Sequence, residues 1–241
     1  MSRGYSLIEL MIAMLIALFL LAGLLLIVQN MRSTYNTQNQ VAQLEDGERL
    51  AMMLASDVIQ AAGYFPDPAD NQASTAFPAY GAFASSQAVT GSYAGAAPGD
   101  SISVRFMTAN NDSIINCTGG TNKTGADATY INTFSVDAQG NLDCTLTTNG
   151  TAAPAVPLVS GVNNFQVWYG VTTNPASADN NVDTYLTAAQ MNLTPSYWLA
   201  VTAVKVRITF ANPIASQTGG TPTVNYIESV MDVMARAGAT T

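Results

Sequence analysis

Residues 1–28 read MSRGYSLIELMIAMLIALFLLAGLLLIV, and this stretch decides how the rest of the chain is organised. The run from 10 to 28 contains 19 residues and no charged side chain. As an α-helix it would be about 28 Å long, close to the thickness of the hydrocarbon core of a bilayer. Glu9 stands at its start and is the one charge between Arg3 and Arg32. The stretch therefore predicts a membrane-spanning helix that begins with a carboxylate.

A cleaved secretory signal does not fit this stretch. Such a signal has a shorter apolar core, and a small-residue cleavage site follows it. Here the polar residues Gln29 and Asn30 follow the run directly. A plain signal anchor fits the length of the run but gives no reason for an acid beside it.

The string RGYSLIELMIAMLI, residues 3–16, resembles the class III leader and N-terminal helix of type IV pilins and type II secretion pseudopilins. The resemblance implies that a prepilin peptidase cuts between Gly4 and Tyr5 and methylates the new N-terminus at Tyr5. Glu9 then becomes the fifth residue of the mature chain, where this family carries a glutamate. Tyr5 replaces the family's usual phenylalanine and keeps an aromatic ring at that position.

Two roles for Glu9 follow from its position. Ser6 and Glu9 have the S-x-x-E spacing of a capping box at a helix start. Alternatively, the Glu9 carboxylate pairs with the α-amino group of Tyr5 on a neighbouring subunit, because an unpaired charge in an apolar setting is costly. The two roles are compatible. We favour the assembly role, because an acid within a membrane segment is usually functional.

Composition excludes several functional classes. The chain has a net charge of −8, only 10% charged residues and no histidine. Without histidine there is no Ser-His or Cys-His catalysis and no histidine metal site. The acidic balance is opposite to that of a nucleic-acid-binding protein. We therefore expect no enzyme activity, no cofactor and no nucleic-acid partner.

Two cysteines, Cys117 and Cys144, lie in the part that we expect outside the cytoplasm. An even number of cysteines in that compartment favours a disulfide, and two thiols alone make a poor zinc site. Closing a loop of about 28 residues would stabilise the fold by about 3.5 kcal/mol. The alternative is a pair of free buried thiols.

The helix is expected to continue beyond the apolar run. From 29 to 62 there is no proline, and apolar residues recur at a spacing of three to four. These residues are Val41, Leu44, Ala51, Leu54, Val58 and Ala62. Gly63, with Pro66 and Pro68 beyond it, marks the end of the helix. The sequence thus predicts a leader at 1–4, a membrane and assembly half at 5–28 and an amphipathic half at 29–63.

Beyond the helix, residues 64–100 are expected to be rich in loops and 101–241 to form a β-rich head. Alternation predicts strands at 101–106, 162–171, 198–210 and 224–233, with a hairpin from 130–136 and 142–146. In the first of these strands we expect Ile102, Val104 and Phe106 on one face, and Ser103 with Arg105 on the other. Aromatic residues are expected to pin the preceding loop: Phe77, Tyr80, Phe83 and Tyr93. The fold class is α+β, a long N-terminal helix packed on an antiparallel sheet.

The string ERLAMMLASDVIQAAGYF, residues 48–65, resembles the end of the first helix in minor pilins of the PilW type. The order of LVSGVNNFQVWYGV at 158–171 and WLAVTAVKVRITF at 198–210 is similar to the head of the same type. We give Asp57, which matches this helix pattern, a structural role.

Two polar clusters in the head are weak candidates for binding. Asp179, Asn181 and Asp183 could ligate calcium through oxygen atoms, but they lack the spacing of a calcium-binding loop and favour a self-bonded turn. Lys205 and Arg207 form a small positive stripe. We interpret this stripe as a solvated strand face, because nucleic acid would require more cations, ideally with aromatics between them.

The resemblance implies a minor type IV pilin, a structural subunit that helps to initiate pilus assembly and is incorporated into the pilus. Its expected partners are the major pilin, other minor pilins, prepilin peptidase, the inner-membrane assembly platform and the lipid bilayer. The expected location is the bacterial inner membrane with the head in the periplasm, and then the pilus at the cell surface. Two alternatives stay open: a J-type pseudopilin of type II secretion, and a membrane-anchored adhesin.

Overall fold

A computed structural model describes residues 6–173, 181–211 and 225–234. Among these residues, 6–43 belong to one compact unit, and 44–173, 181–211 and 225–234 belong to a second. The first unit contains the start of the long helix α1 (Leu7–Gln60), whose 54 residues confirm the prediction of a single continuous helix. The leader residues Arg3, Gly4 and Tyr5 lie outside the described residues.

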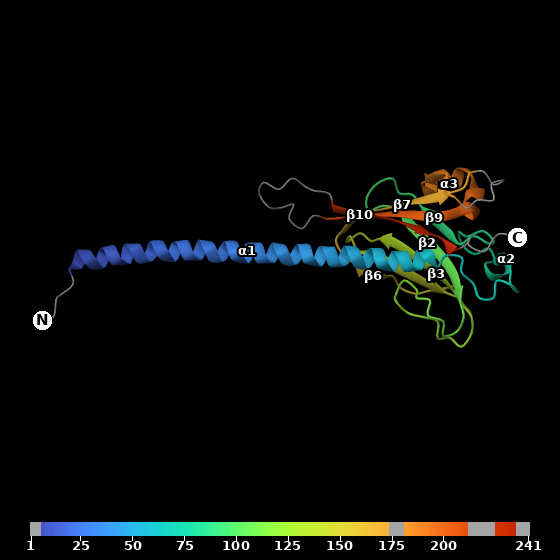
Figure 1. Ribbon diagram of the computed structural model, residues 1–241, viewed down its shortest axis with the longest axis horizontal. Coiled ribbons are helices and arrows are strands. Elements are labelled where there is room, and N and C mark those ends of the chain that lie inside the picture. The colour runs from blue at the N-terminus through green and yellow to red at the C-terminus, as the bar shows by residue number, and fades with distance from the viewer. Residues whose placement is uncertain (1–5, 174–180, 212–224, 235–241) are drawn as a thin grey trace. The chain divides into compact units, whose positions relative to one another are not determined.

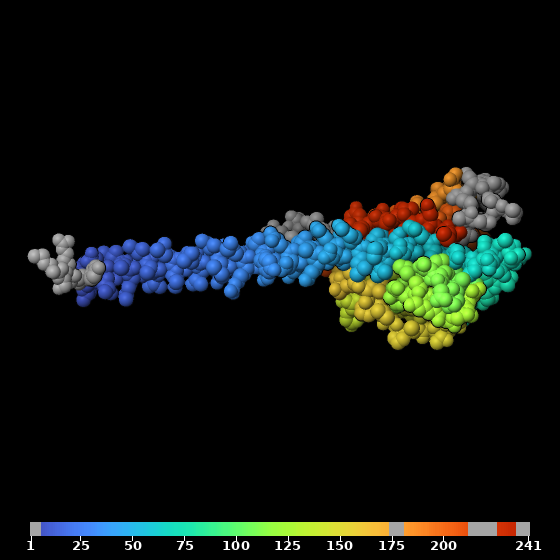
Figure 2. All heavy atoms as spheres, turned by 60° about the horizontal axis from the view of Figure 1, so that its bottom comes forward, coloured from blue at the N-terminus to red at the C-terminus, as the bar shows by residue number. Residues whose placement is uncertain are grey.

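The second unit contains the end of α1 and the strands (Figure 1). Small residues at the end of the helix, Ala51, Ala55 and Ala62, are buried together with Val58 and Ile59. These side chains share one hydrophobic core with the inward residues of the strands. Figure 2 shows the cyan end of α1 between the red residues of β10 (Asn225–Asp232) and the green residues that follow β2 (Ser101–Thr108). Of the predicted apolar stripe, Ala51, Val58 and Ala62 are thus buried in the head, whereas Val41, Leu44 and Leu54 are half-buried.

The helix ends where the sequence predicts. Gly63 has φ 78°, a conformation that a side chain would oppose. Its N–H donates to the carbonyl of Arg105 at 2.9 Å, and the Tyr64 carbonyl accepts from the Met107 N–H at 2.8 Å. The chain leaving α1 is therefore hydrogen-bonded directly to β2.

In the described residues the strands form two antiparallel sheets, one of six strands and one of four. The six-stranded sheet has the order β1-β2-β3-β4-β5, with β6 also paired to β4. Besides β2, its strands are β1 (Val89–Ser92), β3 (Ala128–Val136), β4 (Leu142–Thr148), β5 (Thr151–Ala152) and β6 (Val156–Val159). The hairpin predicted around 137–141 joins β3 to β4, and Gly140 in its turn has φ 77°.

The four-stranded sheet has the order β10-β9-β7-β8. Besides β10, its strands are β7 (Val162–Val171), β8 (Thr184–Leu186) and β9 (Val201–Phe210). On β9 the predicted alternation holds, because Val204, Val206 and Ile208 are buried and the residues between them are only partly covered. The α+β class is confirmed, with the antiparallel sheet present as two sheets.

Three short helices complete the described chain: α2 (Ala73–Ala76), α3 (Ala188–Leu193) and the 3-10 helix η1 (Pro195–Ala200). The predicted strand 198–210 was wrong in its first three residues, which belong to η1. Pro195 starts this turn, and Trp198 folds inward, with its ring edge-on to Tyr169 at 4.7 Å and its Nε1 donating to Asn192 at 3.0 Å. The segment 64–100, expected to be loop-rich, contains α2 and β1.

Asp100 connects the two sheets. It is buried, and its two carboxylate oxygens accept from the N–H groups of Ala94 at 3.0 Å and Val167 at 2.9 Å. Its own N–H donates to the Phe165 carbonyl at 2.7 Å. Because Val167 and Phe165 lie on β7, this one residue fixes the position of the four-stranded sheet against the segment that enters β2.

Candidate functional site

The start of α1 carries the residue for which the sequence predicts an assembly role. The Glu9 carboxylate accepts a long hydrogen bond of 3.5 Å from the N–H of Ser6, which is one of the two bonds of a capping box. Glu9 is exposed, so the rest of its carboxylate is accessible. The local bond is therefore compatible with a second partner.

Among the described residues, α1 is a helix long and apolar enough to cross a membrane. Its most apolar window has a mean hydropathy of 3.1, and none of that window is buried. A surface this apolar requires lipid or protein around it, because exposed apolar area in water is unfavourable. The first half of α1 is thus built for an apolar environment, and its second half belongs to the core of the head.

Cys117 and Cys144 form a disulfide, with their Cα atoms 6.0 Å apart. Both residues are fully buried. The bond attaches the segment between β2 and β3 to β4, and the Cys117 N–H donates to the side chain of Asn132 at 2.9 Å. A segment with no helix or strand of its own is therefore held at its centre by a covalent bond and a buried hydrogen bond.

Alternation placed Arg105 on the face of its strand opposite to Val104 and Phe106, but it did not predict that Arg105 would be buried. Its exposed fraction is 2%, and its guanidinium lies between the rings of Phe77 and Phe83, with centroids 5.1 and 4.8 Å away. Its N–H groups donate to four peptide carbonyls, those of Phe77, Pro78, Ala84 and Gln87. Burial lowers the pKa of Arg105 to about 10, so the group is still charged at neutral pH.

We name this group the Arg105 clamp: Arg105, its two aromatic neighbours and the four carbonyls. The clamp holds the segment between α2 and β1 against β2. The charge is tolerated because the carbonyl dipoles and ring faces replace its water. Of the four aromatics predicted to pin this segment, Phe77 and Phe83 are buried and do so, whereas Tyr80 and Tyr93 are about half exposed.

The structure describes only part of the calcium candidate, namely Asn181 and Asp183. Asp179 lies outside the described residues. The Asp183 carboxylate accepts from both the N–H and the hydroxyl of Thr173, at 2.7 and 3.0 Å. Thr172 donates to the carbonyl of Asn181 at 2.7 Å. These bonds join the segment to Thr172 and Thr173 and are not the local bonds of the turn that we favoured, which stays a prediction. The described residues contain no group of three or more His, Cys, Asp or Glu side chains suited to a metal.

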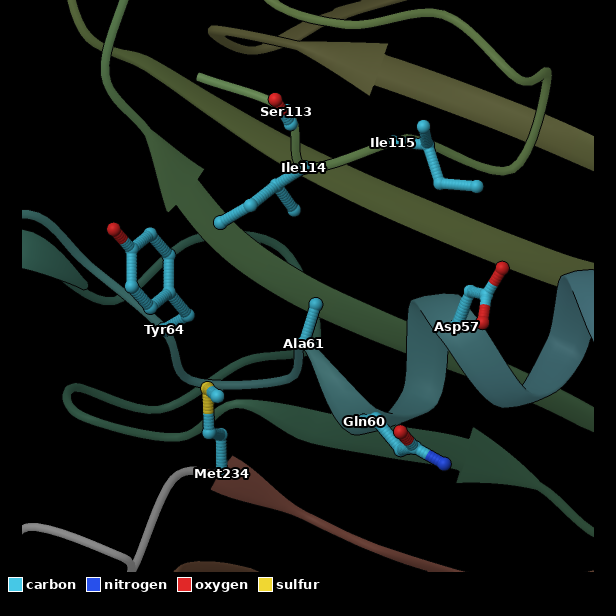
Figure 3. Close-up of a pocket in the computed structure, with 8 residues that line it drawn as sticks. All are labelled: Asp57, Gln60, Ala61, Tyr64, Ser113, Ile114, Ile115 and Met234. Atoms are coloured by element: carbon cyan, nitrogen blue, oxygen red, sulfur yellow. The ribbon is translucent and has the colours of Figure 1, made fainter.

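A hollow of about 390 Å³ lies in the head at the end of α1 (Figure 3). It is lined by Asp57, Gln60, Ala61, Tyr64, Ser113, Ile114, Ile115 and Met234. Figure 3 shows Tyr64, Ile114 and Met234 on one side and the carboxylate of Asp57 on the other. Four of the lining side chains are polar, those of Asp57, Gln60, Tyr64 and Ser113, and the other four are apolar. Asp57 is exposed here, so the structural role that we gave it rests on its place in the helix pattern alone.

Sequence reasoning missed one surface, on the outer face of the four-stranded sheet. The stripe of Lys205 and Arg207 has aromatic neighbours on the adjoining strands. Lys205 is directly opposite Trp168 of β7, and Arg207 is directly opposite Glu228 of β10. Only the strand order brings these residues together, so no local pattern could have found the surface.

Comparison with known families gives two matches. Residues 1–25 match the prokaryotic N-terminal methylation motif. Residues 122–234, from just before β3 to just beyond β10, match the family described as Type IV Pilus-assembly protein W. A comparison with curated proteins gives no match. The two matched regions are the start of α1 and most of the head.

Proposed function

We propose that the chain acts as a minor pilin, because residues 1–25 match the prokaryotic N-terminal methylation motif and residues 122–234 match the family described as Type IV Pilus-assembly protein W. In this proposal it is a structural subunit that helps to initiate a pilus and then becomes part of it. The observation that carries the proposal is the division of α1, with an exposed apolar half that begins at Glu9 and a second half buried in a β-rich head. Such a chain needs no active site, and both matched families are structural.

Before assembly, the apolar half of α1 spans the inner membrane and the head lies in the periplasm. This placement is supported by the length and hydropathy of the helix and by the disulfide, which requires an oxidising compartment. Prepilin peptidase cuts between Gly4 and Tyr5 and methylates Tyr5. The methylated amine keeps its positive charge at the helix N-terminus.

During assembly, the apolar half of α1 leaves lipid and packs against the corresponding helices of other pilins. Glu9 sets the register, because its carboxylate in this apolar bundle is costly unless a cation neutralises it. The nearest such cation is the amine at Tyr5 of a neighbouring subunit, and the helix dipole assists it. The hydrogen bond from Ser6 leaves the carboxylate free to make this contact.

N-terminal mass spectrometry of the protein from membranes and from sheared surface filaments tests the proposal. We expect a chain that begins at methylated Tyr5 in both fractions, and fewer pili when the gene is deleted. A Gly4→Val variant should keep its leader and stay out of filaments. An intact Met1 in the membrane, or a mature chain that never enters filaments, contradicts the minor-pilin role. If deletion of the gene impairs protein secretion and leaves pilus formation unchanged, the result supports the pseudopilin alternative.

A further inference from the structure

A row of aromatic and cationic side chains crosses all four strands of the β10-β9-β7-β8 sheet. We name it the aromatic–cation ladder, and it consists of Tyr226, Arg207, Trp168, Lys205 and Tyr185. The Arg207 guanidinium lies over the rings of Tyr226 and Trp168, with distances to the centroids of 4.9 and 5.3 Å. The Lys205 ammonium lies over the rings of Trp168 and Tyr185, at 4.6 and 5.4 Å.

The ladder faces away from the core. Its neighbours along β9, such as Val204 and Val206, point inward and are buried. The outer residues of the edge strand are open, with exposed fractions of 57% for Tyr226 and 51% for Val230. Large rings and an apolar Val230, directly opposite Lys205, are therefore presented to the outside on one sheet face.

The side chains of the ladder are held in place before any partner arrives. Arg207 forms an ion pair with Glu228, in which Nη2 and Oε2 are 2.6 Å apart and Nε donates to the same oxygen at 2.8 Å. Each cation is fixed between two rings. Ordering a flexible side chain at an interface opposes binding, so a surface that is ordered beforehand loses less free energy on association.

The composition of the ladder is that of a protein interface. Trp, Tyr and Arg are the residues that most often dominate binding between proteins, and they are enriched at the centre of interfaces. Cation–π pairs on a solvated sheet face also add modest stability by themselves. That contribution explains the contacts but not why Tyr226 and Tyr185 are exposed, with the half-buried Trp168 between them, on this face.

Charge indicates the chemistry of the partner. The chain has 8 basic and 16 acidic residues, and two of those basic residues are adjacent on this face. Lys205 forms no ion pair with a carboxylate within the described ranges. A surface that supplies carboxylates therefore complements it. The exposed residues Glu45 and Asp46 on α1 of this chain are an example of such a surface on a pilin head.

We propose that the aromatic–cation ladder is the docking surface for an acidic face on the head of a neighbouring pilin subunit. The inference rests on the minor-pilin role and names a partner surface for it. Nucleic acid fits less well, because Glu228 already neutralises one of the two cations and the chain as a whole repels a polyanion.

Photo-crosslinking in cells that assemble filaments tests the docking surface. A photoreactive phenylalanine derivative replaces Tyr226 or Tyr185 in the full chain, and matched controls replace Tyr80 or Tyr93, whose exposed fractions are 47% and 49%. We expect the ladder positions to crosslink to a pilin, at an acidic segment found by peptide mapping, with at least tenfold higher yield than the controls. Equal yields, or adducts to nucleic acid or glycan instead, overturn the inference.

A charge reversal separates docking from folding. Lys205→Glu should reduce the crosslink at Tyr226 about tenfold or more, whereas Lys123→Glu, at an exposed position outside the ladder, should leave it unchanged. An unchanged thermal unfolding curve shows that each variant is folded. Chains that enter filaments without the ladder crosslink refute the docking surface and leave the minor-pilin role intact. Chains that never enter filaments refute both.

Discussion

Loss of the bond between Cys117 and Cys144 should reduce the free energy of unfolding of the head by about 3.5 kcal/mol. The two residues are 27 positions apart, and this value is the loop-closure entropy of such a loop in the unfolded chain at 25 °C. For a domain of this size, each 1 kcal/mol corresponds to about 2–4 °C in the midpoint of thermal unfolding. The Cys117→Ser/Cys144→Ser variant should therefore unfold about 7–14 °C below the natural chain.

The measurement is circular dichroism of the full chain in detergent, heated with and without a reducing agent. The reducing agent should lower the midpoint of the natural chain and have no effect on the double variant, which is its control. A difference below about 3 °C would contradict the reasoning. It would mean that the segment around Cys117 is held by its hydrogen bonds alone, or that the unfolded chain is already compact there.

Three further substitutions test other parts of the structure. Glu9→Gln should leave cutting and membrane insertion intact but reduce the amount in sheared filaments about tenfold, a change worth about 1.4 kcal/mol; immunoblots against an Asp70→Asn control, at an exposed acid of the head, measure this, and equal incorporation would show that the Glu9 charge is not needed. Arg105→Met leaves four carbonyls without their donor and should destabilise the head by about 3 kcal/mol or more, seen as a lower unfolding midpoint, with Arg105→Lys in between. Burial and the charge of Asp137 raise the pKa of Asp143, so its ionised form is less favourable in the folded than in the unfolded chain. That cost is present above the raised pKa and vanishes below the unfolded value, so Asp143→Asn should raise the midpoint at pH 7 and leave it unchanged near pH 3. A gain of the same size at both pH values would contradict this cause.

Local sequence patterns predicted most of the helices and strands of the fold. The long continuous helix α1, the break in the chain at Gly63 just beyond its end and the hairpin at 137–141 each follow from neighbouring residues, and the structure contains all three. The division of the strands into two sheets could not be predicted in this way. Strands β6 and β7 are separated only by residues 160–161 and still belong to different sheets. The contact that holds β7 against the other sheet comes from Asp100, whose hydrogen bonds to Phe165 and Val167 join residues distant in sequence.

Two arrangements of charged side chains in the head were not predicted. Alternation along β2 placed Arg105 on the face opposite to Val104 and Phe106 and did not predict its burial, since an unpaired charge is rarely buried. The segment that covers Arg105 supplies carbonyls and rings from about 20 to 30 residues earlier in the chain. No residue of the strand itself indicates that these groups will surround the arginine. The ladder was missed for a similar reason, because Trp168 and Lys205 meet only through the pairing of β7 with β9.

The sites predicted at the N-terminus differ from the clamp and the ladder, because they were assigned from one short stretch of sequence. Gly4, Tyr5 and Glu9 were assigned from a motif that spans a few consecutive residues, which is why the sequence alone named them. Their proposed partners are a peptidase and a second subunit. A single chain can display the carboxylate of Glu9, but the amine that it is proposed to meet belongs to another molecule.

For the proposed minor pilin, the Arg105 clamp has a consequence outside the cell. A buried arginine is more often held by a carboxylate, and an acidic medium would release such a pair by protonating the acid. Here the acceptors are peptide carbonyls, which take up no proton in any environment that a bacterium meets. The chain also has no histidine whose charge would change on mild acidification. The segment between α2 and β1 should therefore keep its position when surface filaments pass from neutral to acidic surroundings.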